Sequence, residues 1–137
     1  MTFSQYTYFT APKPANVQLV LRISGLAEMA SLVNRAKTMK YPALVVEDAP
    51  DMNLNLQDRT FEDQQHTFYV LNYAAANDDA KREAAYTGAL AIGKLLLINM
   101  ELPYGSVVDK SNVYAFRVGP LGDGAYGYGF SYGVSEG

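Results

Sequence analysis

The stretch Tyr126-Gly127-Tyr128-Gly129-Phe130-Ser131-Tyr132-Gly133-Val134 decides the fold, because large and small residues alternate along it without a break. A period of two places the aromatic side chains on one face of a β-strand and the small residues on the other. A strand face that is nearly bare lets another backbone approach closely, so we expect a helix to pack on the glycine face. The aromatic face is then left for a second layer of the domain or for a partner.

The residues before this strand predict a β-hairpin. Val113 to Val118 read as a strand, and residues 119–124, Gly-Pro-Leu-Gly-Asp-Gly, form a cluster of turn residues. Residues 122–127 also match G-x-G-x-x-G, but a dinucleotide-binding site needs a helix after that motif, and here a strand follows. We therefore interpret residues 119–124 as a hairpin turn.

A long helix is expected upstream, from a cap at Asn77 to about Asn99. Asp78 and Asp79 fall in its first turn, where the helix dipole favours carboxylates. Beyond Glu83 the segment is almost entirely Ala, Leu, Ile and Gly, which predicts that most of its circumference is covered by protein. Its two interior glycines cost about 1 kcal/mol each relative to alanine, which favours close contact with the bare strand face.

Residues 61–74 predict a long strand, with Thr67, Tyr69, Leu71 and Tyr73 on one face and His66, Phe68, Val70 and Asn72 on the other. His66 is the only histidine, and because the chain lacks a G-x-S-x-G motif we interpret it as structural.

An acidic stretch precedes this strand. Six of the fourteen acids lie there with the single base Arg59, namely Glu47, Asp48, Asp51, Asp58, Glu62 and Asp63. Carboxylates this dense can bind calcium or form an acid/base pair, but their spacing does not fit an EF-hand. We predict that residues 48–59 form an exposed acidic loop that faces solvent or repels another polyanion.

The first part of the domain predicts a strand, a helix and a strand. Residues 17–23 alternate like a short strand, although Val20 interrupts the pattern and a helical start is the alternative. Ser24 can cap a helix that ends near Tyr41, because Pro42 disfavours helical geometry in the residue before it. Ala43 to Glu47 are almost wholly apolar and predict a central strand.

Residues 1–14 are expected to form an extended arm. They are rich in aromatic residues, and Pro12 and Pro14 favour an extended chain. The arm is either folded back on its own domain, frayed, or docked on a neighbouring subunit. Tyrosine is enriched at protein interfaces, and the candidate subunit-interface residues are Phe3, Tyr6, Tyr8, Phe9, Tyr126, Tyr128 and Tyr132.

Length and composition predict a single globular domain over residues 15–137, since 49% of the 137 residues are hydrophobic and 18% are charged. The absence of cysteine excludes disulfides, thiolate metal sites and cysteine nucleophiles, and one histidine cannot build a His-rich metal site. A net charge of −3 argues against a general nucleic-acid binder. We expect no catalytic residues, cofactor or metal, and neither a secretory signal nor a transmembrane segment.

The predicted fold is therefore α+β, with a mixed or mainly antiparallel sheet of four to five strands packed against two helices. The expected order is (β)-α-β-β-α-β-β, after the extended arm. This order resembles the tail terminator and neck (head–tail connector) proteins of long-tailed bacteriophages, particularly over Tyr41-Pro42-Ala43-Leu44-Val45-Val46, residues 65–71 and Asn77-Asp78-Asp79.

The resemblance implies a structural virion subunit, made in the host cytoplasm, that forms or caps a ring at the head-proximal end of a tail. The implied partners are other copies of the chain, for example in a hexamer, and neighbouring tail or connector proteins, with the acidic loop facing a lumen through which DNA passes. The alternative is a non-catalytic module that binds a small ligand or peptide on the aromatic face of residues 126–134.

Overall fold

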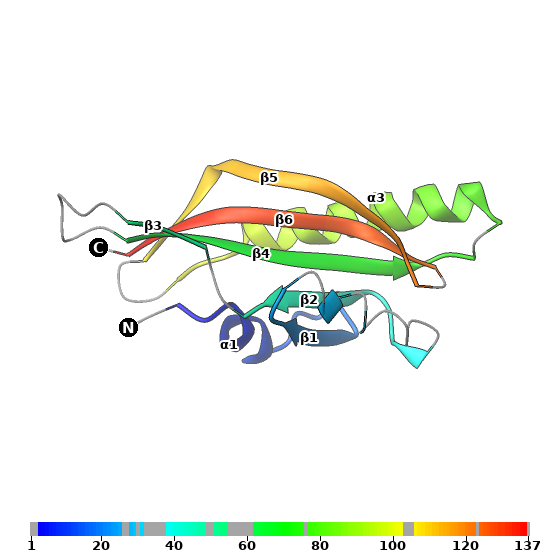
Figure 1. Ribbon diagram of the computed structural model, residues 1–137, viewed down its shortest axis with the longest axis horizontal. Helices are drawn as coiled ribbons and strands as arrows, with labels where there is room; N and C mark the ends of the chain where they lie inside the picture. Colours follow the sequence, from blue (N-terminus) through cyan, green and yellow to red (C-terminus); the bar gives the residue numbers. More distant parts are fainter. Residues whose placement is uncertain are drawn as a thin grey trace.

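The computed structural model describes residues 3–25, 28–29, 31, 38–48, 51–54, 62–75, 77–102, 106–122 and 124–136. These residues form an α+β fold with a mixed sheet (Figure 1). The elements are α1 (Gln5–Thr10), β1 (Leu19–Ile23), β2 (Ala43–Glu47), β3 (Asp51–Leu54), β4 (Glu62–Tyr73), α3 (Asp79–Ile98), β5 (Val107–Leu121) and β6 (Ala125–Glu136). The strand order is β1-β2-β4-β6-β5, and β3 pairs with β4 beside β2.

The antiparallel strands β4, β6 and β5 form the long part of the sheet. β4 and β6 pair over their whole length, from Glu62 opposite Glu136 to Tyr73 opposite Ala125. The predicted long strand and the predicted hairpin are both confirmed, and β5 is longer than the expected Val113–Val118. Gly119, near the end of β5, and Gly124, in the turn, have φ angles of 125° and 147°, which residues other than glycine rarely adopt.

The parallel pair β1–β2 extends the sheet on the other side of β4. Ala43 to Val46 are fully buried, which confirms the expectation of a central apolar strand. Because β1 and β2 run parallel while all other pairs are antiparallel, the sheet is mixed.

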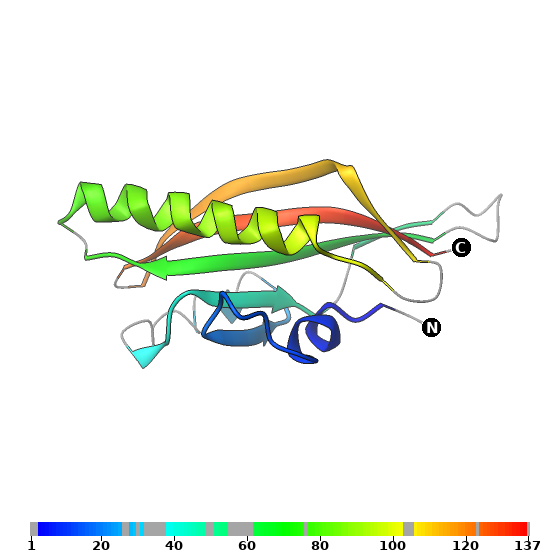
Figure 2. The same cartoon turned by 180° about the vertical axis from the view of Figure 1, so that it is seen from behind.

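The helix α3 packs on the aromatic face of β6, so the expectation that it packs on the glycine face is wrong. Phe130 and Phe68 stack with ring centroids 5.1 Å apart in the main core, and a Cβ atom at Gly93 of α3 would overlap the Phe130 ring. The aromatic face supplies the apolar area that a helix buries, and the glycine of the helix makes room for a ring. Figure 2 shows α3 lying along this side of the sheet.

The glycine face is covered by side chains and backbone of the neighbouring strands. A Cβ atom at Gly129 would overlap the ring of Phe116 in β5, and one at Gly127 would overlap the backbone carbonyl of Val70 in β4. A second, smaller core of Ile23, Met29, Val45, Tyr69, Leu71 and Ala125 lies on this side. We call the two sides of the sheet the helix face and the glycine face.

The helix α3 begins one residue later than expected, because Asp78 rather than Asn77 is the N-cap and its Oδ1 accepts a hydrogen bond from Lys81 N at 3.0 Å. Only one side of α3 is buried, through Ala85, Tyr86, Ala89, Gly93 and Leu97. The expectation that most of its circumference is covered is therefore wrong. No helix within the described residues is long and apolar enough to cross a membrane.

The N-terminal segment is not an extended arm, because residues 5–10 form α1. Ser4 caps this helix by accepting a hydrogen bond from Thr7 N at 3.3 Å, and Gln5 and Phe9 on one side are 3% and 2% exposed. The spacing of four residues puts both side chains on the sheet. The described fold therefore opens with a helix, which also changes the expected element order.

Two other expectations concern residues that the structure describes in part. Half of the residues in the helix expected from Ser24 to Tyr41 lie outside the described residues, and Met29 is buried in the second core. Within the expected loop at residues 48–59, residues 51–54 instead form β3, paired with residues 62–65 of β4. The other residues of that loop, apart from Asp48, lie outside the described part.

Candidate assembly surface

The aromatic residues proposed as a subunit interface lie in the protein's own core. Phe9, Tyr126 and Tyr132 are 2%, 3% and 0% exposed. The remaining four, Phe3, Tyr6, Tyr8 and Tyr128, are partly buried and pack against the main core. These rings stabilise the fold of a single chain, and the aromatic face of residues 126–134 is covered rather than open to a ligand.

Buried hydrogen bonds hold α1 on the helix face. Tyr132 OH donates to Gln5 Oε1 at 2.8 Å, and Gln5 Nε2 donates to the carbonyl oxygen of Thr67 at 2.8 Å. Burial raises the pKa of Tyr132 well above its ordinary value. Because a buried amide or hydroxyl without a partner is costly, these bonds fix the position of α1. Tyr8 adds a link to the chain after α3, where Glu101 N donates to its hydroxyl at 3.2 Å.

His66 is buried beside this network. Its Nε2 lies 3.0 Å from Gln64 Oε1, the Phe3 ring meets it edge-on at 4.9 Å, and Tyr132 stacks on it at 5.8 Å. It is 2% exposed. A histidine enclosed in this way is a packing residue, as the sequence predicted.

Of the residues in the acidic stretch, the structure describes the side chains of Glu47 and Asp48. Asp48 is exposed and forms an ion pair with Arg22 at 2.7 Å. Asp51 belongs to β3, Glu62 and Asp63 begin β4, and Asp58 lies outside the described residues. Among the described residues there is no group of three or more His, Asp or Glu side chains that could hold a metal ion.

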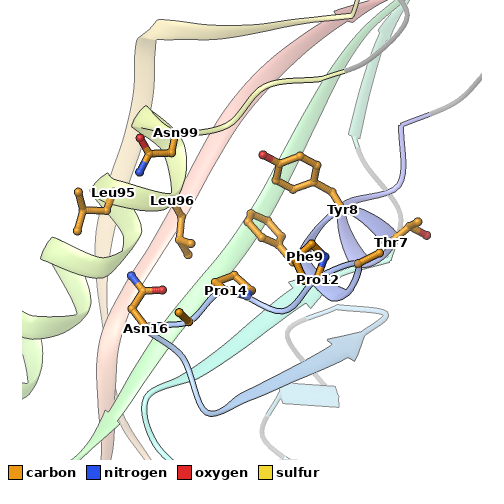
Figure 3. Close-up of a pocket in the computed structure, with 11 residues that line it drawn as sticks. Thr7, Tyr8, Phe9, Pro12, Pro14, Asn16, Leu95, Leu96 and Asn99 are labelled. Atoms are coloured by element: carbon orange, nitrogen blue, oxygen red, sulfur yellow. The ribbon is translucent and has the colours of Figure 1, made fainter.

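The last turns of α3 expose apolar side chains. Leu95 and Ile98 are 51% and 64% exposed. Beside them lies a cavity of about 630 Å³, between the segment from Thr7 to Asn16 and the C-terminal end of α3. Figure 3 shows Tyr8 and Phe9 of α1 across this cavity from Leu96.

A groove separates α3 from β5 on the helix face. Its cavity measures about 230 Å³ and is lined by Leu90, Lys94, Leu97, Ile98, Lys110, Val113, Ala115 and Phe130. Lys110 Nζ donates to the carbonyl oxygen of Ile98 at 2.8 Å, which satisfies the C-terminal end of α3. The groove therefore combines an apolar lining with two exposed ammonium groups.

The strand β5 forms an open edge of the sheet. Among the described residues it pairs only with β6, and Val107 and Tyr114 are 62% and 68% exposed. Tyr114 stacks on Phe116 with ring centroids 5.5 Å apart. An irregularity in the pairing separates Asp109 from Tyr114. Hydrogen bonds from Ser111 lower the pKa of Asp109.

We call the end of α3, the groove and the outer edge of β5 the α3–β5 surface. Sequence reasoning missed this surface because it treated α3 as enclosed. The signal was present, however, since Ala91, Leu95 and Ile98 follow helical spacing on the side opposite Ala89 and Gly93. No protein-family model, curated protein or solved structure matches this chain.

Proposed function

We propose that this protein is a structural subunit of an oligomeric assembly, of the tail terminator or neck type that its element order resembles. The observation that carries this proposal is the open edge of β5, a strand of 15 residues beside the exposed end of α3. An unpaired edge offers backbone N–H and C=O groups to a strand of another chain.

The composition of the edge supports an interface. Natural edge strands are protected by charges, prolines and irregular pairing. In β5 such features lie toward its two ends, at Asp109, Lys110 and Pro120, while residues 114–118 keep regular pairing with β6 and the sequence Tyr-Ala-Phe-Arg-Val. The middle of the edge is thus apolar apart from Arg117, whose guanidinium is bound to Glu83 and to the hydroxyl of Tyr128. The exposed apolar side chains at the end of α3 enlarge the surface that a partner could bury.

In this role the chain forms or caps a ring at the head-proximal end of a phage tail and is located in the virion. Its partners are further copies of itself, for example in a hexamer, and adjacent tail or connector proteins. The acidic residues that take no part in contacts between copies then face the lumen, where like charge keeps DNA from adhering to the wall.

Sedimentation velocity of the full chain over a range of concentrations tests the proposal. We expect oligomers, and we expect Tyr114→Lys to weaken their association about tenfold by placing a charge in the apolar edge. Tyr73→Lys is the matched control, because Tyr73 is also an exposed strand tyrosine, at 45%, but lies outside β5. A wild-type chain that stays monomeric throughout would overturn the proposal.

The cavity between α1 and α3 favours a second candidate function, the binding of a small apolar ligand. Its volume of about 630 Å³ is within the usual range of ligand sites, and it is lined by Tyr8, Pro12, Pro14 and Leu96 among others. Fluorescence of anilinonaphthalene sulfonate tests it, since Leu96→Trp should fill the cavity and abolish binding. Equal dye binding by both proteins would exclude this site.

A further inference from the structure

We propose that consecutive copies of this chain join head to tail, with the acidic β3–β4 hairpin of one copy docked on the groove between α3 and β5 of the next. The hairpin consists of β3 and the paired residues 62–65 of β4. This inference rests on the proposed function, because it names the contact that would build the ring.

The groove combines two lysines with an apolar lining. Lys94 and Lys110 are exposed, and the lining also includes the apolar residues Leu97, Ala115 and Phe130. Within the described residues, no carboxylate lies within 4.0 Å of either ammonium group. Asp109 is next to Lys110 in sequence, but its carboxylate accepts hydrogen bonds from Ser111 and its register partner is Gly133, which belongs to the glycine face.

The hairpin has the complementary composition. β3 carries Asp51 together with the apolar residues Met52 and Leu54, and the start of β4 carries Glu62 and Asp63. The whole stretch from Glu47 to Asp63 holds six acids and the single base Arg59. An acidic segment with apolar residues matches a groove with an apolar lining and two lysines in both charge and polarity.

The fold prevents one chain from making this contact with itself. β4 and β6 lie between β3 and β5 in the sheet. Figures 1 and 2 both show β3 and the start of β4 at one end of the long axis, past the last turn of α3. Among the described residues, β3 pairs only with β4 and β5 only with β6, so each keeps a free strand edge for a second copy.

The symmetry of such a contact fits a ring. Donor and acceptor surfaces are different regions of the same chain, which makes the interface heterologous. A heterologous interface repeats from copy to copy and closes into a ring, or grows as a filament when the rotation does not close. It does not stop at a two-fold dimer.

Charge reversal of each surface tests the inference in the full chain. The groove variant is Lys94→Glu with Lys110→Glu, and the hairpin variant is Asp51→Lys with Glu62→Lys and Asp63→Lys. The control for the groove variant is Lys40→Glu with Lys81→Glu, which makes the same change in net charge as the groove variant at exposed lysines outside the groove. Sedimentation velocity at low and high salt gives the association constant of each variant.

We expect each reversed variant to associate about tenfold more weakly than wild type, and the control to associate normally. A chain carrying all five substitutions should regain association, because both surfaces have exchanged sign. A mixture of the two reversed variants should assemble with the two variants alternating, because the lysine-bearing hairpin matches the glutamate-bearing groove and the unchanged hairpin matches the unchanged groove.

The outcomes separate the two proposals. Wild-type oligomers together with a groove variant that assembles normally would overturn this inference and leave the proposed function standing; the groove would then serve another partner, such as an acidic segment of a different protein. Equal weakening in the groove variant and the control would also overturn it, as a net-charge effect. A monomeric wild-type chain would overturn the proposed function itself.

Discussion

The two faces of β6 solve the same packing problem in opposite ways. On the helix face the large side chains belong to the strand, as Tyr126, Phe130 and Tyr132. The helix α3 contributes small residues to this contact, such as Ala89 and Gly93. On the glycine face the residues of β6 are small, and the aromatic rings belong to neighbouring strands. Phe116 of β5 lies over Gly129, and Tyr69 of β4 packs edge-on against Phe116 with ring centroids 6.0 Å apart.

This difference teaches that a row of glycines in a strand does not identify a helix as its neighbour. A glycine marks a place where some other group comes close, and that group is a ring at Gly129 and a backbone carbonyl at Gly127. Large and small residues alternate across each contact, as close packing requires. The comparison predicts that substitutions on the two faces differ in cost.

The largest expected difference is between two phenylalanines. Phe130 is 1% exposed and belongs to the main core, so Phe130→Ala should reduce the free energy of unfolding by about 3–5 kcal/mol. Phe116 is only partly buried on the glycine face, and Phe116→Ala should cost about 1–2 kcal/mol. Urea denaturation measures the free energy of unfolding of both variants. Equal losses would show that the two faces contribute equally to stability.

The next comparison lies within the glycine face. Gly127→Ala should cost about 2–3 kcal/mol, because the new methyl group meets the backbone of β4, which cannot move without breaking the strand pairing. Gly129→Ala should cost about 1 kcal/mol, since it meets a partly buried ring that can turn. Urea denaturation of the two variants tests this expectation. A larger loss of stability for Gly129→Ala than for Gly127→Ala would mean that the Phe116 ring is held more firmly than the strand backbone.

A third comparison uses the two glycines of α3. Gly93→Ala should destabilise the protein by about 1 kcal/mol, because overlap with the Phe130 ring outweighs the gain in helix propensity. At Gly88 the new methyl group would lie 3.2 Å from Asn72 Nδ2, which belongs to a partly exposed side chain and donates to the carbonyl oxygen of Ala85 at 3.1 Å. Because a shift of a few tenths of an ångström relieves this contact, Gly88→Ala should gain up to about 0.5 kcal/mol. Thermal unfolding of the two variants should shift in opposite directions.

The smallest expected effect is alkaline destabilisation through one tyrosine on each face. Burial raises the pKa of Tyr132, and burial with a hydrogen bond to Glu47 raises that of Tyr69. Both hydroxyls stay protonated in the folded state while the unfolded chain ionises near its ordinary pKa of about 10, so stability is intact below that pH and falls above it.

The test is the free energy of unfolding between neutral pH and about pH 11, a range that spans the ordinary tyrosine pKa. Tyr69→Phe and Tyr132→Phe should each flatten the decline in the free energy of unfolding above pH 10. A decline that is identical in the wild type and both variants would assign the alkaline loss to other groups.

Much of the sheet and of α3 is readable from the sequence, because strict alternation in residues 126–134 and an alanine-rich run after acidic cap residues are strong local patterns. The face on which α3 packs was not readable, since glycines are compatible with either a helix or a ring as neighbour. β3 was hidden because Asp51 and Asn53 are poor strand formers, and its pairing with β4 overrides their propensity.

The N-terminal helix was missed for a different reason. A helix of six residues has little stability of its own, and α1 depends on contacts that are distant in sequence. The hydrogen bond between Gln5 and Tyr132 joins residues near the two ends of the sequence, and no local sequence pattern predicts it. The position of the α3–β5 surface could not be predicted either. The sequence shows that apolar residues occur on every side of α3, but which of them are exposed depends on the side of α3 that packs on the sheet.

The pairing of β4 with β6 also sets the order in which the molecule can fold. β5 and β6 are neighbours in sequence, whereas α3 and β5 separate β4 from its partner β6. Closing so long a loop costs chain entropy before any contact compensates for it, and proteins rich in such contacts fold slowly. Until β4 pairs with β6, the β5–β6 hairpin of each unfolded or newly made chain exposes a strand edge with aromatic side chains. We therefore expect a refolding rate limited by β4 docking and a yield that falls with protein concentration, which stopped-flow fluorescence at several concentrations would measure; a concentration-independent yield would show that the hairpin is covered early.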